Sequence, residues 1–244
     1  MQLEGKKALV TGAAKRVGKA LALALAAQGV HIVVHYGRSE EEARQTATEI
    51  EALGVQAWLH SADLGDEAQL LDVVPSALKL AGGLDILVNS ASIFPPEGFG
   101  EVTPQSWERN MRVNLKAPFF LSQAFAQSLN EGQAGAIINL IDAVAMRPQT
   151  HHFSYAISKR GLEALTENMA LALASRNIRV NAVALGAILP AVNDDPDKFA
   201  RMAEGIPLRR TGNPQQVVDA MLYLLQADFV TGEVIRVDGG RHLI

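Results

Sequence analysis

The sequence predicts an α/β fold: a single domain over residues 1–244, built on a doubly wound, seven-stranded parallel sheet with helices on both faces. Two observations carry this prediction. Short β-rich runs alternate with longer stretches of helical periodicity along the chain, which is the rhythm of βαβ units. The strand runs are continuously apolar, as in parallel sheets covered on both faces, and right-handed crossovers between them produce a doubly wound sheet.

The expected elements follow in order along the chain. We expect strands at residues 7–10, 31–34, 56–59, 86–89, 136–140, 179–183 and 234–237. Helices are expected at residues 20–28 and 41–53, and longer ones at 105–130 and 154–174, with Gly29, Gly54 and Gly82 closing helical segments. The most irregular stretch, residues 186–212, follows a strand end and is therefore the expected substrate lid.

Composition weighs against several classes of partner. At 244 residues and 48% hydrophobic content, the chain is long enough to fill one large core. Its formal net charge of -4 argues against nucleic acid or anionic membrane, which select basic surfaces. No apolar run is long enough to span a bilayer and residues 1–7 lack a signal-peptide stretch, so the cytoplasm is the expected location. Without cysteine, disulfides and thiolate chemistry are excluded.

A metal site is not expected. His151 and His152 are adjacent in the sequence, so their side chains point in different directions, and no further ligand stands at a suitable spacing. We expect these histidines to line the mouth of a substrate cleft or to be solvated.

A turn rich in small residues joins the first strand to the first helix. It reads Thr11-Gly12-Ala13-Ala14-Lys15-Arg16-Val17-Gly18. Small residues here bring backbone amides and a helix N-terminus close to a pyrophosphate. A tight strand-to-helix connection alone would use the same glycines, but the place of this turn, as the first in a βαβ chain, predicts a dinucleotide site.

The end of the second strand indicates which dinucleotide is bound. It reads His35-Tyr36-Gly37-Arg38-Ser39. An NAD site usually has an acidic residue at this place, whereas a basic residue suits a 2′-phosphate, so NADPH is expected. Ser39 also begins a capping-box spacing, and the two roles are compatible because a helix N-terminus is itself a phosphate site.

Tyr155 and Lys159 lie one helical turn apart, and Asp142 stands where a hydroxyl would be expected before such a tyrosine. An ammonium beside a phenol stabilises phenolate, so we expect Lys159 to lower the pKa of Tyr155 from about 10. An ionised Asp142 repels a ketone oxygen, but it accepts hydrogen bonds from a nitrogen heterocycle, or delivers a proton to one if its own pKa is raised. The structural alternative is that Asp142 ends a strand and caps the next turn.

With these residues the chain resembles the short-chain dehydrogenase/reductase superfamily over its whole length, which implies a Rossmann fold. Further matching motifs are Asp63-Leu64 after the third strand, Asn89-Ser90-Ala91-Ser92 after the fourth, Asn114, and Val237-Asp238-Gly239-Gly240. The resemblance implies that Asp63 holds adenine, that Asn89 and Ala91 shape the cofactor floor, and that Asn114 orders a proton-relay water.

Three departures from the superfamily pattern are similar to one subgroup. Arg16 replaces the middle glycine of the turn, Asp142 the catalytic serine, and Ser92 the last glycine of the motif after the fourth strand. At these three positions the chain looks like the pteridine reductases and the related dihydromonapterin and dihydrofolate reductases. The resemblance implies that Arg16 touches the pyrophosphate and a pterin carbonyl, and that Phe94 stacks on the pterin. The structural alternatives are an exposed arginine at a helix start and a phenylalanine packed under the following loop.

The expected site residues fall into three sets. The catalytic set is Asp142, Tyr155, Lys159 and Asn114. The substrate set is Arg16, Ser92, Phe94, Asp142 and Tyr155. The cofactor set is Gly12, Lys15, Arg16, Val17, Gly18, His35, Tyr36, Arg38, Ser39, Asp63, Leu64, Asn89, Ser90, Ala91, Tyr155, Lys159, Gly186 and Ile188. Leu185 stands where the superfamily usually has proline, so the path of the lid is left unassigned.

The expected activity is hydride transfer from NADPH to a pterin, dihydropterin or dihydrofolate, with Tyr155 and Asp142 handling the protons and Lys159 on the nicotinamide ribose. The first alternative is a carbonyl reductase acting on a 3-oxoacyl thioester or another ketone, which would want a hydroxyl at position 142. The second is a non-catalytic NADPH-binding protein, which is hard to reconcile with Tyr155, Lys159 and Asn114. The resemblance also implies a homotetramer paired through the helices at 105–130 and 154–174.

Overall fold

Seven parallel strands form one sheet in the computed structural model, which describes residues 1–148, 150–191 and 196–244. Their order across the sheet is β3-β2-β1-β4-β5-β6-β7, and each neighbouring pair is parallel. The strands are β1 Lys7–Val10, β2 His31–Tyr36, β3 Ala57–Ser61, β4 Ile86–Asn89, β5 Gly135–Asp142, β6 Ile178–Leu185 and β7 Val234–Val237. The predicted doubly wound sheet is confirmed, with all seven strands at the expected places.

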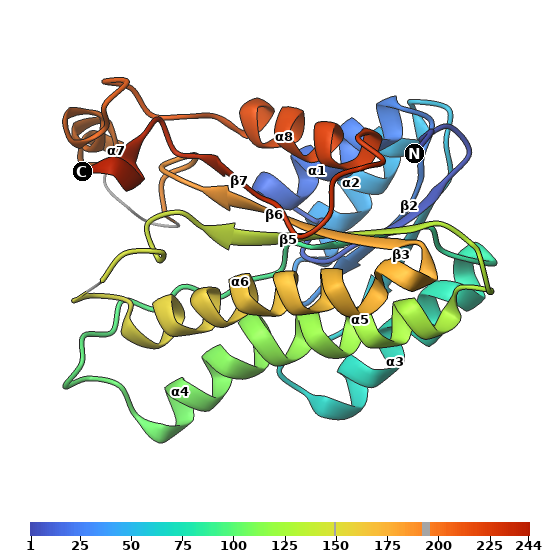
Figure 1. Ribbon diagram of the computed structural model, residues 1–244, viewed down its shortest axis with the longest axis horizontal. Coiled ribbons are helices and arrows are strands. Elements are labelled where there is room, and N and C mark those ends of the chain that lie inside the picture. The colour runs from blue at the N-terminus through green and yellow to red at the C-terminus, as the bar shows by residue number, and fades with distance from the viewer. Residues whose placement is uncertain (149, 192–195) are drawn as a thin grey trace.

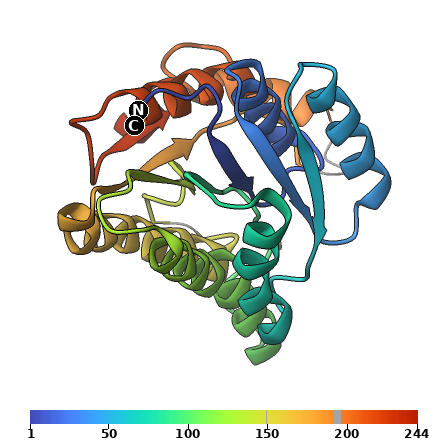
Figure 2. The same cartoon turned by 90° about the vertical axis from the view of Figure 1, so that its right-hand side faces the viewer.

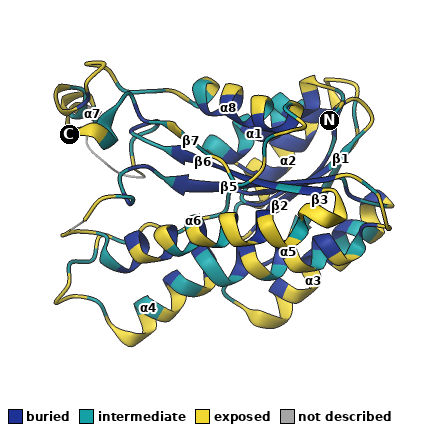
Figure 3. Ribbon diagram, in the orientation of Figure 1, coloured by how far each residue is buried: buried dark blue, intermediate teal, exposed yellow. Residues whose placement is uncertain are grey.

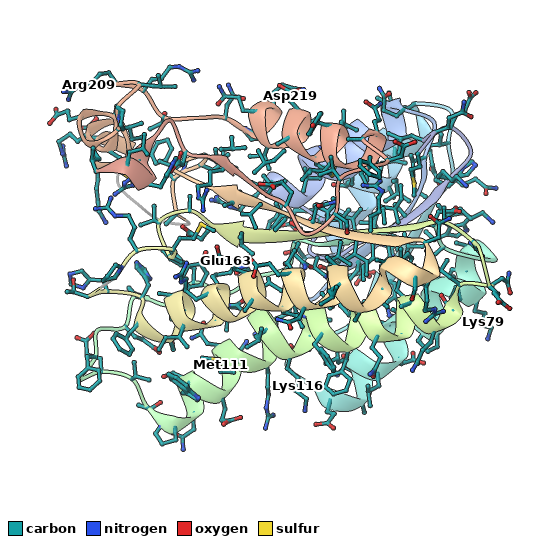
Figure 4. The ribbon with its side chains drawn as sticks, viewed as in Figure 1. Lys79, Met111, Lys116, Glu163, Arg209 and Asp219 are labelled. Carbon is teal, nitrogen blue, oxygen red and sulfur yellow. The ribbon has the colours of Figure 1, made fainter. Side chains whose placement is uncertain are left out.

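Helices cover both faces of this sheet (Figure 1, Figure 2). One face carries α1 Arg16–Ala27, α2 Glu40–Glu51 and α8 Pro214–Gln226; the other carries α3 Glu67–Ala81, α4 Pro104–Met111, α5 Ala117–Ser128 and α6 Phe153–Leu173. Asp219 and Lys116 mark the two layers in Figure 4. The short α7 Pro196–Arg201 lies in the predicted lid, of which residues 192–195 are outside the described part. Within the described ranges, no helix has the length and apolar character needed to cross a membrane.

The apolar strands supply a core on each side of the sheet. Leu9, Leu87 and Ile137 pack among the side chains of α3 and α5. The next residue of β4, Val88, and that of β5, Ile138, pack on the opposite face with α1 and α8. Figure 3 shows the central strands in the colour of buried residues and the helices exposed on their outer sides, whereas the edge strands β3 and β7 are only partly buried. Burial of both faces explains why the strands are continuously apolar in sequence.

The helix predicted over residues 105–130 is present as a continuous helical run with a π-helical segment in its middle, and the one predicted over 154–174 is present as α6. Between α4 and α5 the chain forms a π-helical segment, Arg112–Lys116. The Ala117 N–H donates to the Arg112 carbonyl across this segment, and Pro118 has no N–H to give to the carbonyl of Asn114, four residues earlier. Pro118 was therefore the signal for the interruption.

Close packing at the turn after β1 requires two glycines. Gly12 has φ +66°, and a Cβ on it would lie 3.0 Å from the Cα of Ala91. A Cβ on Gly18 would lie 2.2 Å from the carbonyl oxygen of Gly12, so no other residue fits without moving the backbone. The glycines bring the end of β1 against α1 and β4, at the point where the strand order reverses and where sheets of this kind bind ligands.

Candidate active site

A cavity of about 480 Å³ opens at the carboxyl ends of the strands around β1. It is bounded by the glycine-rich turn, the ends of β2 to β5 and the segment after β6. The predicted site residues that line it are Gly12, Lys15, Arg16, Val17, Gly18, His35, Tyr36, Ser39, Asp63, Leu64, Ser90, Ala91, Ser92, Asp142, Tyr155, Lys159, Gly186 and Ile188. Residues from distant parts of the chain that the sequence assigned to one site thus meet around one cavity.

Other lining residues were not among the predicted ones: Ala14, Gly37, Ala62, Ile93, Arg109, Val113, Leu140, Ile141, Leu185 and Leu189. Most of them are apolar neighbours of predicted residues in the sequence. Arg109 differs, because it carries a charge into the lining from α4. No sequence signal separates it from an ordinary exposed helix arginine.

Four predicted residues do not line the cavity in the described part of the chain: Arg38, Asn89, Phe94 and Asn114. Asn89 is buried, and its amide donates to Asn139 Oδ1 at 2.8 Å. The side-chain amide of Asn114 makes two hydrogen bonds with the backbone of Ile93, accepting from its N–H and donating to its carbonyl, each at 2.9 Å. Asn89 and Asn114 therefore support the cavity wall from behind.

The helix starts at the cavity carry no side-chain caps. Lys15 and Ser39 are the N-cap residues of α1 and α2, and neither side chain makes a capping hydrogen bond. The capping box considered for Ser39 is therefore not formed. The first backbone N–H groups of a helix have no partner inside it, and they attract anions. Both helix starts are thus suited to phosphate groups.

Arg16 links the glycine-rich turn to the segment after β6. Its φ of +58° lies in the left-handed region, which costs a residue with a side chain about 1 kcal/mol or more. Its guanidinium Nη2 donates to the carbonyl of Pro190 at 2.5 Å. Arg16 is exposed, as the structural alternative expected, but it also closes one side of the cavity.

The two carboxylate oxygens of Asp142 have different partners. Oδ1 accepts hydrogen bonds from the backbone N–H groups of Val144, at 2.7 Å, and Ala145, at 3.1 Å. Oδ2 accepts a hydrogen bond from the Tyr155 hydroxyl at 2.8 Å. Asp142 thus caps the turn after β5 with one oxygen, as the structural alternative expected, and holds the tyrosine with the other.

The prediction that Lys159 lowers the pKa of Tyr155 is wrong for this structure. Burial raises the pKa of Tyr155 well above 10, and the charge of Asp142 and its hydrogen bond to the hydroxyl add to the effect. A carboxylate that accepts a hydrogen bond from the phenol disfavours phenolate. Tyr155 therefore holds its proton and is a potential acid.

Lys159 lies below the tyrosine in the wall of the cavity. Its Nζ donates to the carbonyl of Leu140 at 2.8 Å and lies 5.8 Å from the centre of the Tyr155 ring. Burial lowers the pKa of Lys159 to about 8, against an opposing effect of Asp142. The ammonium form still prevails at pH 7, with one backbone partner and further N–H donors available.

Phe94 is not packed away under the loop that follows it. Its side chain is 47% exposed, and its ring stacks on that of His152 with 3.6 Å between centroids and 12° between planes. The Tyr155 ring meets it edge-on at 4.5 Å. His152 is held by a 2.7 Å hydrogen bond between its Nδ1 and the Pro95 carbonyl. Phe94 and His152 therefore pack against Tyr155, although neither lines the cavity within the described residues.

His35 is buried behind the glycine-rich turn. The N–H of Gly12 donates to its Nδ1 at 3.3 Å, and its Nε2 lies 3.2 Å from the Ala62 carbonyl. Burial, and then the neighbouring His60, lower the pKa of His35 to about 4. The ring is therefore neutral at pH 7, with Nδ1 as acceptor and Nε2–H as donor.

This depressed pKa predicts a loss of stability on acidification. The unfolded chain protonates this histidine below about pH 6.5, whereas the folded protein protonates it only near pH 4. Stability is therefore full above pH 6.5 and falls with decreasing pH, by about 2 kcal/mol at pH 5. Urea unfolding at pH 7 and pH 5 measures this, with His35→Asn as the control that removes the titrating group. An equal loss in the two proteins would contradict the assignment.

The doubly wound sheet, the phosphate-type turn at its switch point and the Tyr155–Lys159 pair define a dinucleotide-dependent oxidoreductase. Residues 12–242 match the family described as enoyl-(acyl carrier protein) reductase. The chain belongs to the short-chain dehydrogenase/reductase superfamily.

The proteins of this superfamily to which the chain is similar are named for different substrates. The chain is 33% identical to an L-rhamnose 1-dehydrogenase (NAD(P)(+)) of a Sphingomonas species, over 99% of this chain and 98% of the relative. It is 33% identical to a 3-oxoacyl-[acyl-carrier-protein] reductase FabG of Staphylococcus epidermidis, over 98% and 99%. A crystal structure of FolM alternative dihydrofolate reductase 1 from Brucella canis complexed with NADP matches with TM-score 0.93 and 34% identity, covering 100% of this chain and 97% of that one.

Proposed function

We propose that this protein is an NADPH-dependent reductase that transfers a hydride to a pterin, a dihydropterin or dihydrofolate. The observation that carries the proposal is Asp142, an acceptor whose Oδ2 lies 2.8 Å from the Tyr155 hydroxyl. A carboxylate at this place favours the N–H donors of a heterocycle and repels a ketone oxygen. The likeness to the Brucella canis dihydrofolate reductase supports the same choice.

The proposed position of the cofactor rests on the N-termini of α1 and α2, which have no side-chain cap. The dinucleotide supplies the hydride from its nicotinamide ring. The N-terminus of α1 would hold the pyrophosphate, and Arg38 with Ser39 at the start of α2 would hold a 2′-phosphate. Asp63, Gly186 and Ile188 line the cavity; Asp63 would hold adenine, and Gly186 and Ile188 would meet the nicotinamide end. NADP in the Brucella canis structure supports this arrangement.

The chain's own groups divide the proton chemistry. Burial and Asp142 keep Tyr155 protonated, and the hydroxyl would deliver this proton to the reduced substrate. Lys159, whose Nζ donates to the Leu140 carbonyl, would bind the ribose with its remaining N–H donors and stabilise the phenolate that the transfer leaves. Asp142 orients the phenol and binds substrate N–H groups. Asn114, whose carbonyl has lost the α-helical donor at Pro118, would order a relay water.

Substrate binding is assigned to Arg16, Ser92 and Phe94 together with the catalytic pair. Phe94 stacks on His152 and meets Tyr155 edge-on, and the exposed part of its ring would pack against a planar substrate. Arg16 lines the cavity and lies at a lid carbonyl, so its guanidinium is within the region where a phosphate and a heterocycle carbonyl would meet.

A carbonyl reductase is the second candidate. The specific observation in its favour is the similarity to the Staphylococcus epidermidis 3-oxoacyl reductase over almost the whole chain. A non-catalytic NADPH-binding protein is a third reading, and it would require that purified protein bind NADPH without turning over any substrate of either class.

We also propose a cytoplasmic homotetramer. Leu171 of α6 is 83% exposed and Phe119 of α5 is 38% exposed, so the outer layer of long helices offers apolar surface for a second copy. Light scattering on purified protein measures the mass directly, and a monomeric mass would contradict the tetramer.

The test of the activity is the initial rate of NADPH oxidation with dihydrobiopterin, dihydromonapterin and dihydrofolate, run beside acetoacetyl thioester and repeated with NADH. We expect turnover of a pterin or folate with NADPH preferred by at least about 10-fold, the effect of one charged 2′-phosphate contact. Turnover of the thioester alone would transfer the assignment to the carbonyl reductase class.

A further inference from the structure

The glycine-rich turn is held by two sets of side-chain hydrogen bonds, one on each side. On the β4 side, the Thr11 hydroxyl accepts from the N–H groups of Ser90 and Ala91 and donates to the Val88 carbonyl. On the β2 side, the contact is His35, whose Nδ1 accepts from the Gly12 N–H. The turn is thus fastened to both neighbouring strands before α1 begins.

His35 reaches two strand ends at once. Its Nε2 lies 3.2 Å from the carbonyl of Ala62, just after β3, and its own carbonyl accepts from the Ala13 N–H at 2.9 Å. The side chain is only 2% exposed. The first two amides after Thr11 are therefore both committed to residue 35, and the amides that remain are those at the start of α1.

We propose that His35 is a positioning residue for cofactor binding, which turns the Gly12 amide inward so that the later amides of the turn face the pyrophosphate. This inference rests on the proposed NADPH function. The Gly12 amide is part-buried at the edge of the cavity, so without the His35 acceptor it would turn toward another partner, and the turn would rotate with it. His35 therefore acts through the backbone and not through contact with the reacting atoms.

Two substitutions separate the two ring nitrogens. His35→Asn keeps an acceptor at the position of Nδ1, next to Gly12, and gives up the contact with Ala62. His35→Gln keeps a donor near the position of Nε2 and gives up the Gly12 contact. His35→Leu removes both. His60→Asn is the matched control, because His60 is 6.2 Å from His35 by ring centroids and its Nε2 has no hydrogen-bond partner among the described residues.

The experiment measures the dissociation constant of NADPH by its fluorescence, after thermal melts have established that each variant is folded. His35→Leu and His35→Gln are expected to weaken NADPH by about 10-fold or more, the effect of one lost buried hydrogen bond. His35→Asn is expected to stay within about 3-fold of the original protein, and His60→Asn to match it.

Several results would overturn the inference. Unchanged affinity in folded His35→Leu would show that the turn needs no such support. Recovery by His35→Gln and not by His35→Asn would assign the effect to Ala62. Failure of the original protein to bind NADPH or NADH would instead overturn the proposed function. If the protein bound NADH instead, and the variants ranked in the same order of affinity, the inference would stand and the preference for NADPH would be overturned.

Discussion

Replacing Tyr155 by phenylalanine is expected to lower kcat by about 10³-fold, the range of an acid that donates in the transition state. The substitution removes the hydroxyl, and with it the proton to be donated and the 2.8 Å hydrogen bond to Asp142. The ring stays against Phe94. The affinity for NADPH should change by less than about 3-fold, because the cofactor loses at most one weak contact, that with the Tyr155 hydroxyl.

Single-turnover kinetics with the substrate found most active measure this effect. Tyr223→Phe is the matched control, because Tyr223 is 55% exposed on α8, on the opposite face of the sheet from α6. A decrease of less than 10-fold in Tyr155→Phe would remove the tyrosine from the role of acid.

Replacing Asp142 by serine is expected to lower pterin or folate turnover by about 10²-fold or more, because the acceptor for the substrate N–H groups is lost. The same change should lower the pKa of Tyr155, since the charge and the hydrogen bond of Asp142 both raise it. Ultraviolet titration of the phenol, with Tyr155→Phe as the blank, measures that shift.

Asp142→Asn is the matched variant for this experiment, because it keeps an oxygen for the Val144 and Ala145 amides and removes the charge. Loss of the cap alone costs about 1 kcal/mol, so a melt separates lost stability from lost chemistry. Full pterin turnover by Asp142→Ser would refute the assigned role, and a gain of thioester reduction would place this residue at the branch between the two substrate classes.

The sheet could be predicted from sequence because its signal is local. Continuous apolar runs and glycine-marked helix ends need no knowledge of partners, and the glycine-rich turn is a contiguous motif. The residues around the cavity followed from the same logic, since parallel strands bring their carboxyl ends to one edge. The π-helical segment was foreseeable from Pro118, although the periodicity on both sides of it concealed the interruption.

The direction in which the pKa of Tyr155 shifts could not be predicted in the same way. Helical spacing places Lys159 one turn away, but it does not say which group the hydroxyl meets. In the fold the Tyr155 hydroxyl donates a hydrogen bond to Asp142, and Lys159 donates one to the Leu140 carbonyl. The placement of Asn89 beneath the cavity wall likewise depends on its buried partner Asn139, which comes from another strand.

The left-handed backbone at Arg16 implies a conflict between stability and activity. Glycine adopts this conformation without strain, so Arg16→Gly is expected to gain about 1 kcal/mol of folding stability while losing the bridge to Pro190. A selection for thermal resistance alone would therefore favour glycine here, and a selection for turnover would restore the arginine. In a laboratory-evolved variant, the residue at position 16 would therefore indicate whether stability or turnover had been selected.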